Sequence, residues 1–193
     1  MFQEISVTLD PKSIILIAAA VVVVVIVVAV LLSQRRKSAL RNRFGPEYDR
    51  AVRERGSERA AQSLLADREK RVQRFNIREL TPKERTFFDE RWHSVQSQFV
   101  DDPKGAVIAA DETVISLMGT RGYPMADFDQ RAADLSVDHP QLVENYRAAR
   151  QISIRHRKGQ ASTEDLRQAM IYYRSLFEEL LERDASSRDR KVA

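Results

Sequence analysis

Hydrophobic residues concentrate in one unbroken stretch near the start of the chain. From Ile14 to Leu32 there are 19 consecutive apolar residues with no charge, no Gly and no Pro. At about 1.5 Å per residue a helix of this length rises ~28 Å, which is close to the thickness of a bilayer's hydrocarbon core. The pattern predicts one transmembrane helix over residues 14–32, after a short tail over residues 1–13. Asp10-Pro11 is typical of a helix start, and Gly45-Pro46 of a helix end.

A secretory signal peptide is the main alternative to an anchor. Such a peptide begins with basic residues, has an apolar core of roughly 7 to 15 residues and ends in a cleavage site of the A-x-A type. Here Glu4 and Asp10 accompany Lys12 in the leading segment, and the longer apolar run ends in LLSQRRK with no small-x-small site. These differences favour an uncleaved membrane anchor.

A basic cluster follows the apolar stretch directly. By the positive-inside rule, this asymmetry predicts that the rest of the chain lies in the cytoplasm. The same side chains are candidates for contact with anionic lipid headgroups, worth about 1 kcal/mol per basic residue, although they also serve as a topology signal alone. Aromatic residues do not interleave with them, which disfavours nucleic acid as a partner. The cluster consists of Arg35, Arg36, Lys37, Arg41 and Arg43.

Residues 33–80 are rich in charge and poor in apolar positions. Between Ser33 and Arg59 there are nine Lys and Arg against four Asp and Glu. Helices are expected over Glu47–Arg55 and from Ser57 to about Arg74, but the apolar stripe of the second is thin and is interrupted by Arg68. We expect a basic juxtamembrane segment followed by a charged helical stalk or a loosely docked helix.

Residues 81–183 have the pattern of a folded helical domain. Thr81-Pro82-Lys83-Glu84 combines an N-cap, a proline at the first helical position and the acid of a capping box. Apolar residues then recur at helical spacing in successive segments, the last beginning at Ser162 or Thr163, and no segment alternates like a half-buried strand. The sequence predicts an all-α protein: one transmembrane helix, a stalk and an irregular bundle of about five helices. Residues 184–193 are expected to form a frayed polar tail.

Composition and the absence of known motifs exclude several kinds of active site and metal site. The formal net charge is +4, and the chain has no Cys, which excludes disulfides, thiolate metal sites and a cysteine nucleophile. The sequence contains no P-loop, no G-x-G-x-x-G, no H-E-x-x-H and no G-x-S-x-G. We therefore expect a protein that is not an enzyme and needs no cofactor.

One acidic region keeps an alternative open. Its carboxylates and histidine could ligate a divalent cation, since hard cations take oxygen ligands. The spacing does not fit an EF-hand, and Asp127 and Asp138 are better interpreted as helix caps. A membrane-tethered hydrolase or a metal-binding protein nevertheless remains the competing interpretation of this region. The region comprises Asp127, Asp129, Asp134, Asp138 and His139.

Three further residues are candidates for a recognition surface. Arg121 and Tyr123 lie in the turn Arg121-Gly122-Tyr123-Pro124, and turns held by rigid elements often bind partners. A tyrosine in such a turn more often packs its ring against a neighbouring helix and forms a hydrogen bond through its hydroxyl, which would give Tyr123 a purely structural role. Tyr172 lies beside the apolar stripe of the last helix and is the better candidate for a contact surface.

Several strings together resemble one family. They are RFGPEYDRAV, FVDDPKGAV, RGYP, ADLSVDHP and ASTEDLRQAM followed by YRSLFEELL, and they span about Leu40 to Leu181. The chain resembles a family of uncharacterised bacterial proteins with an N-terminal membrane segment or a secretion signal, followed by a helical domain. The resemblance implies a bacterial source and no established activity, so it assigns no site residue.

The expected function follows from these features together. We expect a bacterial single-pass inner-membrane protein whose helical domain faces the cytoplasm and serves in interaction or scaffolding. A protein partner, or a second copy of the chain, would then bind it. An envelope-facing structural or stress role is the alternative if the domain lies on the other side of the membrane.

Overall fold

The computed structural model describes residues 11–191 and contains helices only within that range, which confirms the all-α prediction. The first ten residues of the expected N-terminal tail lie outside the described part. Contacts along the chain divide it into two units, residues 1–42 and residues 43–193.

The first helix, α1, runs from Pro11 to Phe44 without interruption. Its start and end agree with the prediction from Asp10-Pro11 and Gly45-Pro46. The stretch Ala19–Phe44 is long and apolar enough to cross a membrane, and no part of its apolar window is buried. A signal sequence near the N-terminus would have the same length and composition.

Two short helices, α2 (Pro46–Arg55) and α3 (Glu58–Val72), follow within the segment expected to be a stalk. Gly56, which has a φ of 71°, ends α2 in the left-handed region that glycine adopts without strain. The hydroxyl of Ser57 then accepts a hydrogen bond from the Ala60 amide and caps α3. These helices pack against each other, and α3 packs against α6 (Phe128–Asp138).

A buried ion network holds α2 and α3 to the domain. The Glu47 carboxylate is fully buried and accepts hydrogen bonds from Arg68 Nη1 at 2.6 Å and from Arg147 at 2.5 and 2.9 Å. Arg71 of α3 donates to the buried Asp134 carboxylate of α6 at 2.8 and 2.6 Å. Burial alone would raise the pKa of Glu47, but the guanidinium groups of Arg147 and Arg68 outweigh it and hold that pKa below its usual value.

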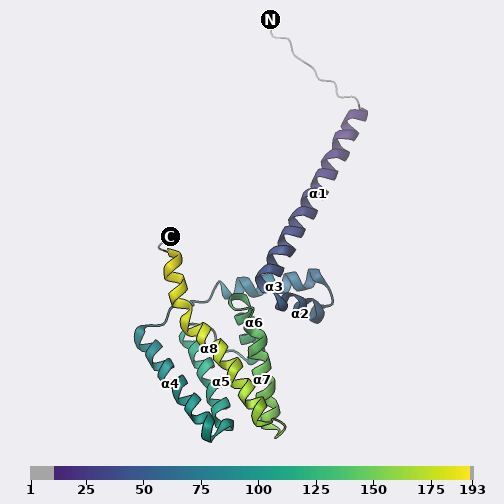
Figure 1. The fold of residues 1–193 in the computed structure, drawn as a ribbon. Helices are drawn as coiled ribbons and strands as arrows, with labels where there is room; N and C mark the ends of the chain where they lie inside the picture. Colours follow the sequence, from purple (N-terminus) through teal and green to yellow (C-terminus); the bar gives the residue numbers. More distant parts are fainter. Residues whose placement is uncertain (1–10, 192–193) are drawn as a thin grey trace. The chain divides into compact units, whose positions relative to one another are not determined.

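The bundle consists of five helices, as predicted. In Figure 1, α4 and α5 form one antiparallel pair, and α8 lies between α5 and α7. The last helix, α8, includes most of residues 184–193. The bounds are α4 Pro82–Asp101, α5 Pro103–Thr120, α6 Phe128–Asp138, α7 Val143–Arg157 and α8 Thr163–Lys191.

Aromatic side chains fill the bundle core. Trp92 of α4 stacks on Phe177 of α8 with ring centroids 4.6 Å apart. Tyr146 of α7 contacts both Phe128 and Tyr173, at 4.8 and 6.4 Å between centroids. The helical stripes seen in the sequence therefore face one shared interior.

Local capping explains most of the helix starts. Thr81 and Glu84 form the predicted capping box of α4, while the carboxylates of Asp102 and Asp127 accept from the amides of the third residue beyond them. The predicted cap at Asp138 is wrong. Asp138 is the last residue of α6, and α7 begins only at Val143, with no side-chain cap at Leu142.

Candidate functional site

The predicted acidic region is distributed among structural contacts. Asp127 caps α6, Asp134 accepts from Arg71 and Gln130, and Asp138 accepts from the Tyr123 hydroxyl at 3.1 Å. The His139 ring lies 3.2 Å from a Glu179 carboxylate oxygen. No group of three or more His, Asp and Glu that could hold a metal ion occurs in the described part of the chain.

The turn proposed for recognition is folded inward. The side chains of Arg121 and Tyr123 are only 5% and 3% exposed. Arg121 donates to the main-chain carbonyl of Leu180, and the Tyr123 hydroxyl bonds to Asp138. A Cβ atom on Gly122, whose φ is 97°, would stand 2.3 Å from the Asn76 carbonyl oxygen, so the turn is also closely packed. These two side chains therefore lie in the interior of the domain, as the packing interpretation of this turn expects.

Tyr172, the third recognition candidate, lies at a groove between α7 and α8. The groove has a volume of about 480 Å³ and is open to solvent. Its α7 wall is formed by Ala148, Gln151, Ile152 and Arg155. Its α8 wall is formed by Ser162, Glu164, Asp165, Gln168 and Tyr172.

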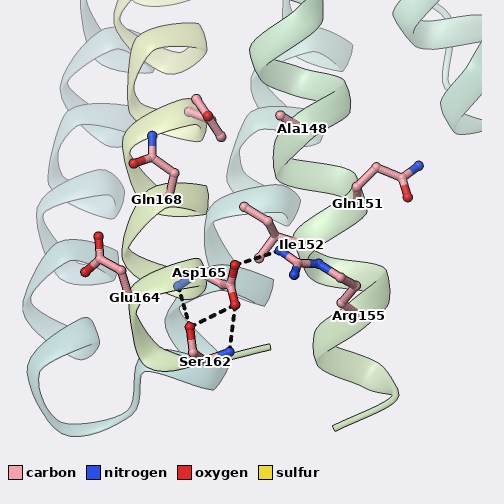
Figure 2. Close-up of a pocket in the computed structure, with 9 residues that line it drawn as sticks. Ala148, Gln151, Ile152, Arg155, Ser162, Glu164, Asp165 and Gln168 are labelled. Atoms are coloured by element: carbon pink, nitrogen blue, oxygen red, sulfur yellow. Dashed lines mark hydrogen bonds and ion pairs between the residues drawn. The ribbon is translucent and has the colours of Figure 1, made fainter. Parts of the chain in front are cut away.

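Charges at the lower end of this groove neutralise one another. Figure 2 shows Arg155 of α7 reaching Asp165 at the start of α8, and the distance from Nη2 to Oδ1 is 2.7 Å. The other Asp165 oxygen accepts from the amide and hydroxyl of Ser162 at 2.9 and 2.8 Å. The Ser162 amide and hydroxyl, together with Arg155, lower the pKa of Asp165 to about 2. Asp165 is therefore ionised and already partnered at neutral pH.

The rest of the groove combines neutral hydrogen-bonding side chains with apolar ones. The side-chain amides of Gln151 and Gln168 can each donate and accept hydrogen bonds. Ile152 and Ala148 add apolar surface, and Tyr172 adds an amphipathic ring of the kind enriched at protein interfaces. The site thus offers neutral hydrogen bonding and moderate apolar area.

A second, more apolar groove lies between α4 and α8. Its volume is about 190 Å³, and two arginines of α8, Arg167 and Arg174, stand at its edge. Both are exposed and paired within their own helix, with Glu164 and Glu178 respectively. The floor is formed by Trp92, Gln96 and Phe99 of α4 with Met170 and Ile171 of α8.

The predicted lipid-contact residues all lie on α1. Arg35, Arg36, Arg41 and Arg43 are exposed, whereas Lys37 is half-buried. Arg43 also pairs with Glu69 of α3.

Sequence reasoning named Tyr172 as a candidate but named none of the other residues that line this groove. The Ser162-x-x-Asp165 spacing is a visible capping signal that points to the lower end of the groove. Nothing in the sequence pairs Arg155 with Asp165, because that contact depends on how α7 and α8 pack.

Comparisons with known proteins do not add an identity. The chain matches no protein-family model, no curated protein and no solved structure. The resemblance to a bacterial membrane-anchored family stays a prediction from sequence.

Proposed function

We propose that this chain is a single-pass membrane protein that presents a helical, non-enzymatic interaction domain at the membrane face. The observation that carries the proposal is the exposed apolar surface of α1 from Val21 to Leu32, within the candidate span Ala19–Phe44. An apolar helix surface that is exposed in the described part of the chain needs another apolar environment, and a bilayer supplies one.

Two features support an anchor over a cleaved signal. The helix α1 continues unbroken through the basic cluster to Phe44, and the sequence around Leu32 has no small-x-small site. The exposed arginines just after the apolar stretch favour a cytoplasmic domain and are in place for anionic lipid headgroups.

The interaction role is supported by the surface of α8. This helix has a polar groove with Tyr172 on its α7 side and an apolar groove on its α4 side. We place the partner protein in the α7–α8 groove, since its hydrogen-bonding groups and its tyrosine match the composition of protein interfaces.

The anchor is tested by extraction and by topology. Alkaline carbonate should leave the full-length chain in the membrane pellet, and mass spectrometry should find the N-terminus intact. A fluorescent reporter fused after Ala193 should be bright, whereas a reporter active only outside the cytoplasm should be silent. Replacing Arg35, Arg36 and Lys37 by Gln should reduce the fluorescent fraction, because the topology signal is weakened.

Opposite results would contradict the anchor or the cytoplasmic position of the domain. Release into the carbonate supernatant or cleavage after Leu32 would exclude the anchor. Activity of the outside reporter would place the domain in the envelope, in line with the structural or stress role.

The interaction surface is tested by cross-linking at native expression. A photo-reactive residue at Tyr172 should yield a discrete adduct with a protein, which mass spectrometry then identifies. The same residue at exposed Gln141 is the control and should yield none. Equal adducts at both positions, or none at Tyr172, would contradict the proposed groove.

A further inference from the structure

A small, comparatively enclosed cavity lies between α5 and α7, away from the groove of Figure 2. Its volume is about 120 Å³, which corresponds to roughly four waters at about 30 Å³ each. The lining residues are Val107, Ile108, Asp111 and Glu112 from α5 with Ser153, His156 and Arg157 from α7.

Asp111 is the more buried of the two carboxylates at this cavity, and the Tyr173 hydroxyl and the Arg150 guanidinium act on it. Its side chain is 17% exposed, and its closest ion-pair contact is Arg150 Nη1 at 3.8 Å from Oδ2. The Oδ1 atom is buried without a hydrogen-bond partner. Buried polar atoms are nearly always hydrogen-bonded, so an atom of this kind indicates a missing partner such as a ligand or a water.

Three other charged or titratable side chains line the cavity: Glu112, His156 and Arg157. In the part of the chain that the structure describes, no ion pair or hydrogen bond involves the side chain of Glu112, His156 or Arg157. Elsewhere on the same two helices, Arg147 and Arg155 are paired with carboxylates. Acidic groups therefore line the α5 side of the cavity, and basic groups line the α7 side.

We propose that this cavity binds a small zwitterion, an amino acid with a short side chain. Its ammonium group would lie at Asp111 and Glu112, and its carboxylate at His156 and Arg157. Charge-assisted hydrogen bonds at both ends would satisfy groups that the fold leaves unpaired.

Size and lining define this class of ligand further. The Ser153 hydroxyl donates to the Ala149 carbonyl oxygen at 3.1 Å, so it can only accept from the ammonium end of a ligand. Val107 is the fully buried apolar wall against which a methyl group could pack. A simple carboxylate would leave Asp111 unsatisfied, and a simple amine would leave Arg157 unpaired. The inference goes beyond the proposed membrane function, because it needs neither a partner protein nor a particular side of the membrane.

Calorimetry on the full-length chain in detergent micelles tests the inference. Glycine and L-alanine are titrated to about 10 mM, because ligands with so few atoms have little surface with which to bind tightly. We expect saturable binding at one site per chain. Acetate and methylamine, which each match one end of glycine, should bind roughly tenfold more weakly or not at all.

Variants show whether the binding occurs at this cavity. Arg157→Gln and Glu112→Gln change exposed side chains that hold no contact in the fold, and each should weaken glycine binding by roughly tenfold. Asp111→Asn should do the same. Lys158→Gln changes a neighbouring exposed cation that does not line the cavity; it is the matched control and should leave glycine binding unchanged.

Three results would contradict the binding of an amino acid at this cavity. Failure of both amino acids to bind would overturn the inference, as would acetate or methylamine binding as tightly as glycine. Glycine binding that survives Arg157→Gln and Glu112→Gln would place the ligand elsewhere. None of these outcomes bears on the anchor or on the Tyr172 cross-link.

Discussion

Asp111 is a buried carboxylate that we expect to lower the stability of the folded chain, and it lines the proposed amino-acid cavity. Burial raises the pKa of its carboxyl group, and the Tyr173 hydroxyl and the Arg150, Arg131 and Arg157 guanidiniums offset this only in part. A buried carboxylate without full hydrogen bonding costs free energy, and natural proteins keep such groups mainly where they bind or react. A substitution at Asp111 can therefore show its effect on the stability of the fold separately from its effect on ligand binding.

Asp111→Asn should raise the melting temperature at pH 7 by a few degrees. The raised pKa means that the folded chain favours the neutral form, so stability is lost as pH rises from the ordinary value of 3.8 through the folded value. An amide mimics the neutral form at every pH. Thermal melts should show the gain at pH 7 shrinking as the pH approaches 4.

Asp101→Asn is the matched control for this substitution. Asp101 is exposed at the end of α4, so its replacement should leave the melting temperature nearly unchanged. A lower melting temperature for Asp111→Asn at pH 7 would mean that Asp111 stabilises the fold through its contact with Arg150.

At the scale of elements, α2 and α3 are held by a buried ion network as well as by buried apolar residues such as Tyr48 and Leu65. The apolar stripe of α3 is thin, and Arg68, which interrupts it, is only 7% exposed because it faces Glu47. Buried ion pairs add little net stability over apolar contacts, but removing one partner leaves an uncompensated charge. The attachment should therefore be sensitive to single changes.

Glu47→Ala should destabilise the domain by about 3 to 5 kcal/mol, because it leaves Arg68 and Arg147 without their carboxylate. Denaturant unfolding gives the size, and hydrogen exchange should show faster exchange in α2 and α3 than in α4 and α5. A loss below about 1 kcal/mol would mean that packing alone holds these helices.

Glu54→Ala serves as the control, since Glu54 pairs with Arg50 on the exposed face of α2 and should cost less than about 1 kcal/mol. Acid should act like the Glu47 substitution. The pKa of Glu47 is lowered in the fold, so its contribution is present above the ordinary value of 4.5 and is lost as pH falls through the lower folded value.

At the scale of the molecule, the chain has two units that make their own contacts, residues 1–42 and residues 43–193. The second contains the aromatic core and the Glu47 network. A unit with its own core and buried ion pairs has what it needs to fold by itself.

A chain that begins at Arg43 should be soluble and should unfold in one cooperative transition. Its circular dichroism should be that of a helical protein, and membranes should no longer retain it, because the apolar stretch is gone. The full-length chain in detergent is the reference for the melting curve. Aggregation, or helical signal without a cooperative transition, would show that residues 1–42 contribute to folding.

Much of the fold could be predicted because it rests on local chemistry. Helix starts followed from caps and prolines at Pro11, Thr81, Asp102 and Asp127, since capping depends on neighbours in sequence. The one wrong cap, Asp138, arose where two signals competed: its carboxylate accepts from Tyr123 instead, a contact made across space.

Less of the site could be predicted, for the same reason. Tyr172 was named as a candidate because it lies beside a periodic apolar stripe. Arg121 and Tyr123 are buried, and a turn motif in the sequence does not say which way its side chains point. The pairing of Arg155 with Asp165, and the position of Asp111 opposite His156 and Arg157, depend on the packing of α7 against α8 and α5.

The sequence by itself determined the helical class, the apolar stretch suited to a membrane and most of the helix boundaries. These properties come from composition, period and capping, which act over a few residues. Only the tertiary structure decided that Arg68 would be buried against Glu47, that Asp111 would lack a hydrogen bond at Oδ1, and which charges would meet at each cavity. Burial and pairing are set by residues distant in the chain, and helical periodicity specifies a face without specifying what lies against it.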